Sequence, residues 1–319
     1  MSATDFIPAS ANALPRYAGV PSFMRLPHLG ADDPRLAEVA IGLIGVPWDG
    51  GTTNRPGARH GPRALRDAST MIRAQHPVTG LRPFEAMTCA DLGDVPPNPA
   101  SVLDSLERIT AFYAPLVAMG IRPLTAGGDH LVSLPVLRAV ARDAPLGFIQ
   151  FDSHTDLFDS YFGGEKFTHG TPFRRAVEEG LIDPKRMVQI GIRGTAYDTE
   201  DLDFARAEGI RIIRIEEVFA RGIPDVMAEA REILGEAPAY LSYDIDFVDP
   251  AFAPGTGTPE VGGPTSFQAQ QVLRELDGVR IAAADLVEVA PPFDNGGITA
   301  WLGASLMFEI LCLMAAAPA

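Results

Sequence analysis

The sequence predicts an α/β fold in which helices cover both faces of a mostly parallel sheet of about eight strands, giving three layers (α/β/α). Short apolar runs alternate along the chain with segments in which apolar residues recur at helical spacing. The runs are apolar at successive positions, which is typical of strands that are covered on both faces. The chain has 319 residues, 46% of them hydrophobic, so it can bury the large core that this fold needs.

Eight short apolar runs, separated from one another by polar or helical segments, are the predicted strands. They cover residues 39–46, 87–90, 122–125, 146–151, 187–192, 210–215, 239–243 and 280–289. Between them, apolar residues at helical spacing predict helices over residues 62–73, 101–119, 131–142, 172–179, 199–208, 224–234 and 266–275. Strand and helix therefore alternate along the chain, as the crossover connections of a parallel sheet require.

The two ends of the chain need separate interpretation. Residues 1–37 are rich in proline and weakly patterned, and we expect them to form an arm that lies over a single domain of residues 38–319. Residues 298–317 are apolar except for Glu309, and about 20 apolar residues are enough to cross a bilayer. Because a carboxylate near the middle is costly in lipid and no basic residue follows, this segment is predicted to be a buried terminal helix.

Charge and cysteine content limit the class of protein. With 26 basic and 41 acidic residues the formal net charge is −15, which argues against a protein that binds the phosphate backbone of nucleic acids. Two cysteines, Cys89 and Cys312, are too few for a disulfide framework and fit a reducing compartment. The N-terminal residues lack the basic and apolar regions of a signal peptide. We therefore expect a soluble cytoplasmic protein that binds neither nucleic acid nor membrane.

Acidic residues and histidines gather directly after three of the predicted strands. Within two of these loops they alternate along the chain, so their side chains point to one side of an extended backbone. The residues are His130 after the third strand, Asp152, His154 and Asp156 after the fourth, and Asp244 and Asp246 after the seventh. Ligands bind outside the carboxyl ends of the strands in sheets of this kind, so these loops are the predicted site.

The chemistry of these six side chains indicates divalent metal ions. Four carboxylates that face one another repel strongly unless a cation lies between them. Oxygen ligands with a few imidazoles suit Mn²⁺ or a similar ion, and six ligands are better explained by two ions than by one. Taken singly, an Asp-x-Asp after a strand is typical of a cap or turn, and a lone His130 is typical of a buried structural histidine. All three groups together are poorly explained in that way.

Three blocks of the sequence resemble the signature blocks of the ureohydrolases, the family of arginase, agmatinase, guanidinobutyrase and guanidinopropionase. The blocks are Gly127-Gly128-Asp129-His130, Asp152-Ser153-His154-Thr155-Asp156, and Ser242-Tyr243-Asp244-Ile245-Asp246 with residues 249–257. Further matches lie at residues 55–62 and 285–289, and the resemblance covers about residues 39–314. Residues 48–54 and 168–175 look most like bacterial guanidino-acid hydrolases, the guanidinopropionases and guanidinobutyrases.

The resemblance implies a urea-releasing hydrolase with two Mn²⁺ ions per chain, with Ni²⁺ or another divalent ion as an alternative. It implies that the metal ligands are His130, Asp152, His154, Asp156, Asp244 and Asp246. It also implies that His169 is the proton shuttle and that Glu288 receives the substrate guanidinium. Without the resemblance, His169 would be interpreted as a histidine at the start of a helix, and Glu288 as the ion-pair partner of an arginine of the protein. Family members commonly form trimers or hexamers, so we expect a homo-oligomer, most simply a hexamer.

The physical chemistry of the reaction agrees with these implied roles. Two cations lower the pKa of a water molecule between them, which makes a nucleophile available at neutral pH. The departing amine must be protonated by a group whose pKa lies near 7, and a histidine such as His169 fits that need. A planar guanidinium can meet a carboxylate through two parallel hydrogen bonds, which would satisfy Glu288 at the end of an apolar strand.

Aromatic residues near the predicted site bear on the substrate. Phe158 stands where arginases commonly have an asparagine that holds the amino-acid end of the substrate, which disfavours arginine. Residues 158–167 contain four aromatic rings and indicate a loop over the pocket mouth, or one anchored to the body or to another subunit. A large ring at Tyr161 would shorten the pocket and favour 3-guanidinopropionate over 4-guanidinobutyrate. Tyr161, Asn54 and Arg55 are candidates to pair the substrate carboxylate.

Two polar residues beside the ligand blocks have no certain role. Ser153 replaces the alanine usual between the first Asp and His of the block, and we expect this change to be tolerated. Asp129 precedes His130, where a carboxylate either orients a ligand or caps a helix.

Other functions remain open from the sequence. The same chemistry with a different substrate tail would make an agmatinase, or a hydrolase of an N-alkylated guanidine or a biguanide. A related group of deacetylases binds one zinc ion, whereas the extra ligands His130 and Asp246 favour two ions. The non-enzyme alternative is an inactive, metal-stabilised partner subunit. Such subunits usually lose ligands, and all six are present here.

Overall fold

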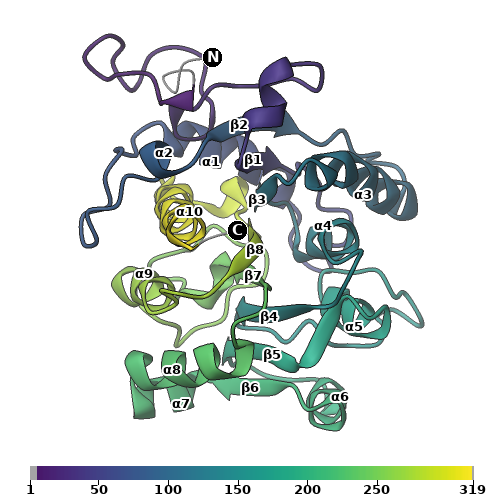
Figure 1. The fold of residues 1–319 in the computed structure, drawn as a ribbon. Coiled ribbons are helices and arrows are strands. Elements are labelled where there is room, and N and C mark those ends of the chain that lie inside the picture. Colours follow the sequence, from purple (N-terminus) through teal and green to yellow (C-terminus); the bar gives the residue numbers. More distant parts are fainter. Residues whose placement is uncertain (1–5, 318–319) are drawn as a thin grey trace.

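Eight parallel strands form one sheet in the computed structural model, which describes residues 6–317. The strands lie in the order β2-β1-β3-β8-β7-β4-β5-β6, and every neighbouring pair is parallel. Their bounds are Ile41–Gly45 (β1), Cys89–Asp94 (β2), Arg122–Ala126 (β3), Leu146–Phe151 (β4), Ile182–Ile192 (β5), Arg211–Arg214 (β6), Ala239–Asp244 (β7) and Ile281–Val287 (β8). Figure 1 shows this sheet between two layers of helices, which confirms the predicted three-layer α/β fold.

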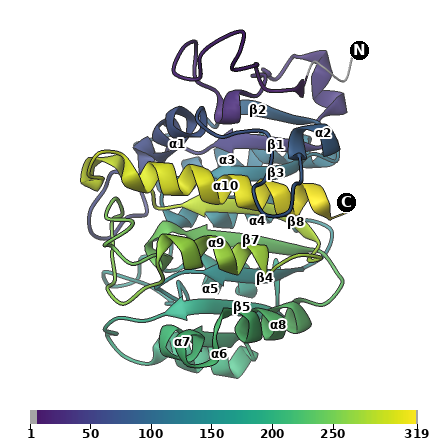
Figure 2. The same cartoon turned by 90° about the vertical axis from the view of Figure 1, so that its left-hand side faces the viewer.

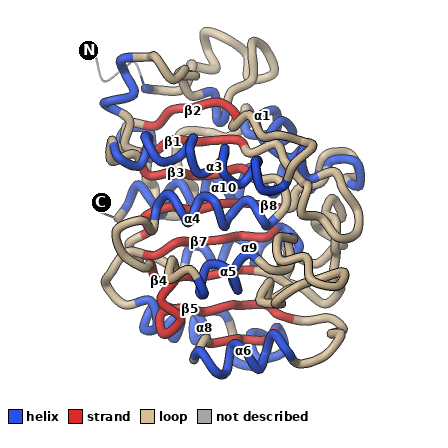
Figure 3. Tube along the Cα trace, turned by 90° about the vertical axis from the view of Figure 1, so that its right-hand side faces the viewer, coloured by secondary structure: helices blue, strands red, loops and turns tan. Residues whose placement is uncertain are grey.

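Helices cover both faces of the sheet. One face carries α1 (Gly61–Ser69), α2 (Pro83–Ala86), α7 (Ile215–Arg221), α8 (Ile223–Leu234), α9 (Ser266–Arg274) and α10 (Ile298–Ala316), which lie toward the viewer in Figure 2. The other face carries α3 (Val102–Ala118), α4 (Ser133–Val140), α5 (Pro172–Glu178) and α6 (Glu200–Glu208), shown in Figure 3. Each face of the sheet is therefore closed off from solvent.

The apolar character of successive strand residues follows from this arrangement. In β1, every residue is buried. Ile41 and Leu43 point into the core under α1 and α10, whereas Ile44 belongs to the core under α3 and α4. Because neighbouring side chains of a strand point to opposite faces, a strand between two cores must be apolar at both sets of positions.

The structure differs from the sequence prediction mainly at element ends. Strand β5 begins at Ile182, five residues before the predicted start, because its first part is polar and partly exposed and carries no apolar signal. Strand β6 ends at Arg214, and Ile215 begins α7, a helix that was not predicted. Helices α2 and α7 have four and seven residues, which is too short for a helical period to be recognised.

The N-terminal arm lies along the edge strand β2 (Figure 1). The amide of Leu29 donates to the carbonyl of Asp91 (2.9 Å), and the amide of Asp91 donates to the carbonyl of Pro27 (3.0 Å). Phe23 and Leu29 are buried, which fixes the arm to the body by apolar contacts as well. The first five residues of the predicted arm, and the last two of the predicted domain, lie outside the described residues.

Helix α10 is apolar on all sides and lies in the core, as predicted for the terminal segment. Among the described residues it is the one helix long and apolar enough to cross a membrane, and 78% of its most apolar window is buried in the protein. Its carboxylate, Glu309, accepts hydrogen bonds from His76 Nε2 (2.7 Å) and Arg274 Nε (3.1 Å). A buried carboxylate with two such partners is stabilised within a protein core.

Candidate active site

The predicted site residues follow four strands that are neighbours in the middle of the sheet, β3, β8, β7 and β4. His130 follows β3 and Glu288 follows β8, while the two acidic blocks follow or end β7 and β4. Because all strands are parallel, their carboxyl ends meet at one edge of the sheet. Residues more than 100 positions apart in the chain are therefore brought together.

Three carboxylates surround the ring of His130. Its Nδ1 lies 3.0 Å from Asp152 Oδ2, 2.9 Å from Asp156 Oδ2 and 3.2 Å from Asp244 Oδ2. A second group lies beside the first, with His154 Nδ1 3.1 Å from Asp246 Oδ2 and 3.6 Å from Asp152 Oδ1. The two oxygens of Asp152 thus face different groups, as expected of a carboxylate shared by two ions.

The cluster fits a pair of divalent cations better than a set of hydrogen bonds. The Nδ1 atom of His130 is buried and has no hydrogen-bond partner of acceptable geometry, although three carboxylate oxygens lie within 3.2 Å. Burial, together with Asp246, raises the pKa of Asp244 well above its usual range, and burial with Asp152 raises that of Asp156 to about 6. Cations between these groups would relieve the repulsion, and oxygen with imidazole is a donor set that Mn²⁺ and Ni²⁺ accept.

Further polar residues hold the clustered carboxylates from behind. Ser153 donates to Asp246 Oδ1 from both its hydroxyl (2.6 Å) and its amide (3.1 Å). Gln150 Nε2 donates to Asp152 Oδ2 (2.6 Å). The sequence interpretation gave Gln150 no role, although an amide inside an otherwise apolar strand is a usable signal. Such contacts restrict the orientation of potential ligands.

His169 and Glu288 form a pair beside the cluster. Glu288 Oε1 accepts from His169 Nδ1 (2.9 Å) and from the amide of His130 (2.9 Å). His169 Nε2 accepts from the amide of Thr53 (3.2 Å) and lies 2.8 Å from its hydroxyl. Burial lowers the pKa of His169, but the charge of Glu288 outweighs it and raises that pKa to about 9. The partner of Glu288 within the protein is therefore a histidine, where the sequence without the resemblance suggested an arginine.

Asp129 caps a helical turn, which is one of the two roles that its position allowed. Its Oδ1 accepts from the amide of Leu131 (3.1 Å) and caps the short helical turn His130–Val132. Its Oδ2 accepts from the amide of Gly51 (2.7 Å), whose carbonyl accepts from the amide of His169 (2.9 Å). Asp129 thus links the turn that carries His130 to the loop that carries His169.

A cavity of about 520 Å³ opens over the cluster. Its deep part is lined by His130, Asp156, Asp244, His169 and Glu288, and its outer part by Phe158, Tyr161, Phe162 and Tyr197. The Phe158 and Tyr161 rings lie edge to face, 5.6 Å apart, and both predicted pocket residues line the cavity. A side-chain carbon on Gly170 would lie 2.5 Å from the Tyr161 hydroxyl, so this glycine lets the ring lie close to the backbone.

Of the three candidates for the substrate carboxylate, two line the cavity. Asn54 and Tyr161 do so, but Arg55 does not, because its guanidinium donates to the carbonyls of Thr256 (2.7 Å) and Gly257 (3.0 Å). Arg193, which also lines the cavity, is used by four backbone carbonyls. Arg214 at the rim is exposed and has no ion pair within the described part of the chain.

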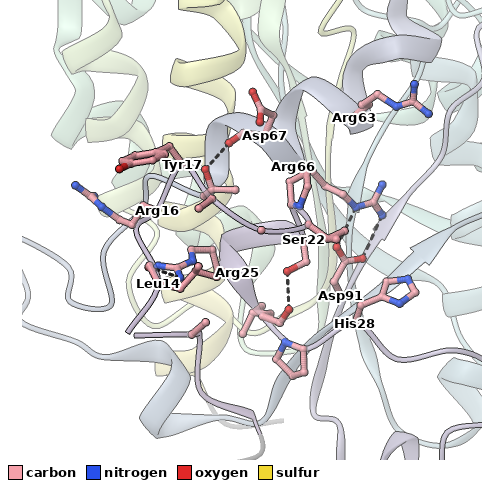
Figure 4. A pocket seen from close by; sticks show the side chains of 18 of the residues that line it. Leu14, Arg16, Tyr17, Ser22, Arg25, His28, Arg63, Arg66, Asp67 and Asp91 are labelled. Atoms are coloured by element: carbon pink, nitrogen blue, oxygen red, sulfur yellow. Dashed lines mark hydrogen bonds and ion pairs between the residues drawn. The ribbon is translucent and has the colours of Figure 1, made fainter. Parts of the chain in front are cut away.

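A second, larger cavity of about 810 Å³ lies between the arm, α1 and β2 (Figure 4). None of the clustered carboxylates or histidines lines it. Its Arg66 guanidinium is paired with Asp91 (2.9 Å) and Asp94 (2.5 Å), so that cation is already neutralised. The smaller cavity, which contains the titratable cluster, is therefore the candidate active site.

Comparison with known proteins places these features in a family. The sequence model of the arginase family matches residues 39–313. Guanidinopropionase of Pseudomonas aeruginosa is 56% identical, over 97% of this chain and 96% of its own length, and guanidinobutyrase of the same organism is 45% identical over 96% of each. The solved structure of proclavaminate amidinohydrolase from Streptomyces clavuligerus superimposes with a TM-score of 0.89 at 40% identity, covering 94% of this chain and 99% of that one.

Proposed function

Since the chain belongs to the arginase family, we propose that this ureohydrolase cleaves a short guanidino acid to urea and an amino acid. The preferred substrate is 3-guanidinopropionate, which gives β-alanine, and the second is 4-guanidinobutyrate. The higher identity to guanidinopropionase than to guanidinobutyrase supports this order. The ring of Tyr161, which lines the cavity, supports it independently, because a large side chain there would shorten the space for the substrate chain.

One observation carries the proposal: two groups of carboxylates and imidazoles share Asp152, and members of both groups line one cavity together with His169 and Glu288. In our proposal the six residues His130, Asp152, His154, Asp156, Asp244 and Asp246 hold two divalent ions, Mn²⁺ in preference to Ni²⁺. When bound, these ions lower the pKa of a water molecule and so supply the nucleophile. All six residues lie at or within five residues of the end of a central strand, which holds the cluster close to the rigid sheet and favours a defined metal spacing.

Glu288 has one oxygen available for the substrate. Oε1 already accepts two N–H groups, whereas Oε2 accepts none from the described residues. A guanidinium that donates to Oε2 would place its carbon over the metal cluster, because His130 and Glu288 are hydrogen-bonded neighbours. We assign Glu288 to binding and orienting the guanidinium group.

In our proposal His169 is the residue that moves a proton. In its neutral form Nδ1–H donates to Glu288 and Nε2 accepts from Thr53, so Nε2 is the atom that gains and loses the proton. When protonated there, Nε2–H donates to the Thr53 hydroxyl or to the departing amine nitrogen. Protonation of the amine allows the carbon–nitrogen bond to break and leaves urea.

The carboxylate of the substrate is expected at the rim of the cavity. Tyr161 and Asn54 offer hydrogen-bond donors there, and Arg214 is a cation without an ion pair in the described chain. In our proposal the substrate carboxylate faces Arg214. A cationic tail such as that of agmatine would be repelled at this position.

Urea release over a panel of guanidino compounds tests the proposal. The panel contains 3-guanidinopropionate, 4-guanidinobutyrate, agmatine, arginine, N-methylguanidine and a biguanide, with metal content measured on the same sample. We expect kcat/KM to be highest for 3-guanidinopropionate. Preference for agmatine would contradict a carboxylate tail, and preference for N-methylguanidine would mean that no tail is recognised. Two bound ions without any turnover would support the inactive partner subunit.

The assembly and location of the protein are also proposals. We propose a homohexamer that is soluble in the cytoplasm and binds neither nucleic acid nor membrane, in which residues 1–37 form an arm and residues 38–319 one catalytic domain. Exposed apolar side chains in the arm, such as Tyr17 and Val20, support contacts between subunits. Light scattering at micromolar concentration checks this, and a monomer would contradict it.

A further inference from the structure

A buried carboxylate, Asp285, lies behind the site and has no part in the proposed reaction. We propose that Asp285, acting through the hydroxyl of Ser242, is a positioning residue that fixes which nitrogen of His130 carries a hydrogen and so prepares that ring to bind a metal ion. This inference rests on the metal centre of the proposed function. It goes further by assigning a role to a residue two hydrogen bonds away from the ions.

Asp285 is completely buried, and in the described part of the chain every side chain that donates a hydrogen bond to it does so through a hydroxyl group. Ser133 Oγ and Tyr240 Oη each donate to its Oδ2 at 2.6 Å, and Ser242 Oγ donates to its Oδ1 at 2.7 Å. Burial and the charge of Asp285 raise the pKa of Tyr240 well above its usual range, so Tyr240 remains a donor. No cation pairs with Asp285 in the described part of the chain, and such a buried charge is costly unless a positive charge lies near.

The direction in which the Ser242 hydroxyl donates its hydrogen determines which nitrogen of His130 carries a hydrogen. A serine hydroxyl has one hydrogen, and here it is donated to Asp285. Ser242 Oγ, which lies 2.7 Å from His130 Nε2, must therefore accept, and Nε2 must carry a hydrogen. In a neutral imidazole the other nitrogen then has only a lone pair. That nitrogen, Nδ1, is the atom that faces the three carboxylates.

A lone pair that points at three carboxylates is repelled unless a cation lies between them. The hydrogen bonds that join Asp285, Ser242 and His130 thus leave a lone pair on Nδ1, which is what a metal ligand needs. No hydrogen bond at Nδ1 accounts for this arrangement. A carboxylate that accepts the hydrogen of a ligating histidine, directly or through another group, also makes the ring a stronger donor to the metal.

A purely structural role for Asp285 leads to different expectations. Its partners come from β7 (Tyr240 and Ser242) and from α4 (Ser133), so the carboxylate also joins separate elements. If that were its purpose, its replacement would destabilise the metal-free protein and leave metal affinity unchanged. If it positions His130, the replacement removes an uncompensated buried charge, so the metal-free protein keeps its stability while metal affinity falls.

The test is Asp285→Asn in the full chain, with two readouts besides activity. Mn²⁺ affinity is measured by competition with a chromophoric chelator, and the melting temperature of the metal-free protein by calorimetry. We expect the Mn²⁺ affinity of at least one ion to fall about 10- to 100-fold, the usual loss when the partner of a ligating histidine is removed. The melting temperature of the metal-free protein should not fall.

Two further variants make the result decisive. Ser242→Ala removes the hydrogen bonds between Asp285 and His130 but leaves Asp285 hydrogen-bonded to Ser133 and Tyr240. Its Mn²⁺ affinity should fall to a similar extent, and this variant keeps the test valid if Asp285→Asn fails to fold. Tyr113→Phe is the matched control, since it removes a buried hydroxyl that is hydrogen-bonded to Thr125 (2.8 Å) and to none of Asp285, Ser242 and His130. The Mn²⁺ affinity of this control should stay within threefold of wild type. Unchanged affinity in Ser242→Ala, or in a folded Asp285→Asn, would overturn the inference. A wild-type protein that binds no Mn²⁺ would instead refute the proposed function.

Discussion

Glu288→Gln is the substitution that separates the proposed substrate contact most cleanly from the surrounding structure. The side chain keeps its shape, and the amide oxygen of glutamine can still accept from His130 N and His169 Nδ1, the two donors that Oε1 has now. The change is confined to the charge and to the second oxygen. That oxygen, Oε2, becomes an NH₂ group that donates where the guanidinium also donates.

The size of the loss follows from these contacts. Because Oε1 is already occupied, the guanidinium depends mainly on Oε2, so one charge-assisted hydrogen bond of about 1.5–3 kcal/mol is removed. A donor that then faces a donor in a buried cavity adds about 1–3 kcal/mol. A total of roughly 2.5–6 kcal/mol corresponds to a fall in kcat/KM of about 10²- to 10⁴-fold. The pKa of His169 should fall as well, since the charge of Glu288 raises it.

The assay is steady-state urea release, with kcat and KM determined separately and metal content measured for each variant. Glu260→Gln is the control, because it removes a carboxylate that lines the same cavity and is not bonded to His169. We expect the control to change kcat/KM less than about threefold, as screened charges do. If Glu288→Gln with full metal content stayed within threefold of wild type, or if both variants lost equally, Glu288 would not be the guanidinium acceptor.

Four shorter predictions follow from the same site. His169→Asn should lower kcat by about 10²–10⁴-fold with both ions still bound, and unchanged turnover would exclude His169 as the proton shuttle. Tyr161→Ala should shift the kcat/KM ratio toward 4-guanidinobutyrate by about 1–3 kcal/mol, and an unchanged ratio would assign the ring to packing. Removing the metal ions with EDTA should abolish urea release and lower the melting temperature, because the ions stabilise the folded state by mass action. If EDTA altered neither urea release nor the melting temperature, the result would contradict a metal centre. In the metal-free protein, burial and neighbouring acids raise the pKa of Asp129 to about 8 and of Asp156 to about 6. The folded state therefore holds more protons than the unfolded chain between about pH 4 and 8, so the melting temperature should rise as the pH falls from 8.5 to 6, and a decrease would contradict these shifts.

The sequence was sufficient for the fold and for the grouping of the acidic residues, for a simple physical reason. In a parallel sheet, every loop after a strand opens at the same edge, so the positions of Asp152 and Asp244 in the chain determined that they would meet. Apolar runs located all eight strands because both faces of the sheet are covered. The roles proposed for His169 and Glu288 came from the resemblance, since neither spacing nor composition distinguishes these two residues.

Contacts between side chains of different strands could not be predicted. The hydrogen bond between Ser242 and Asp285 depends on the register of β7 against β8, in which these two residues are direct neighbours. No local pattern encodes that register. Thr53 was missed as a partner of His169 for a similar reason, because the two residues are 116 positions apart and meet only when the loops fold over the cavity. Strand alternation reveals which residues share a face but not which of them touch.

The position of the arm beside β2 has a consequence for aggregation. An edge strand with unpaired amide and carbonyl groups can pair with another copy of the chain, and here residues 27–29 occupy part of that edge through Asp91. The opposite edge, β6, has only four residues and ends in the exposed cation of Arg214, and a short edge that ends in a charge discourages pairing. A variant trimmed to residues 38–319 would keep all six clustered acidic residues and histidines yet leave β2 open, so it should form sheet-rich aggregates more readily than the full chain.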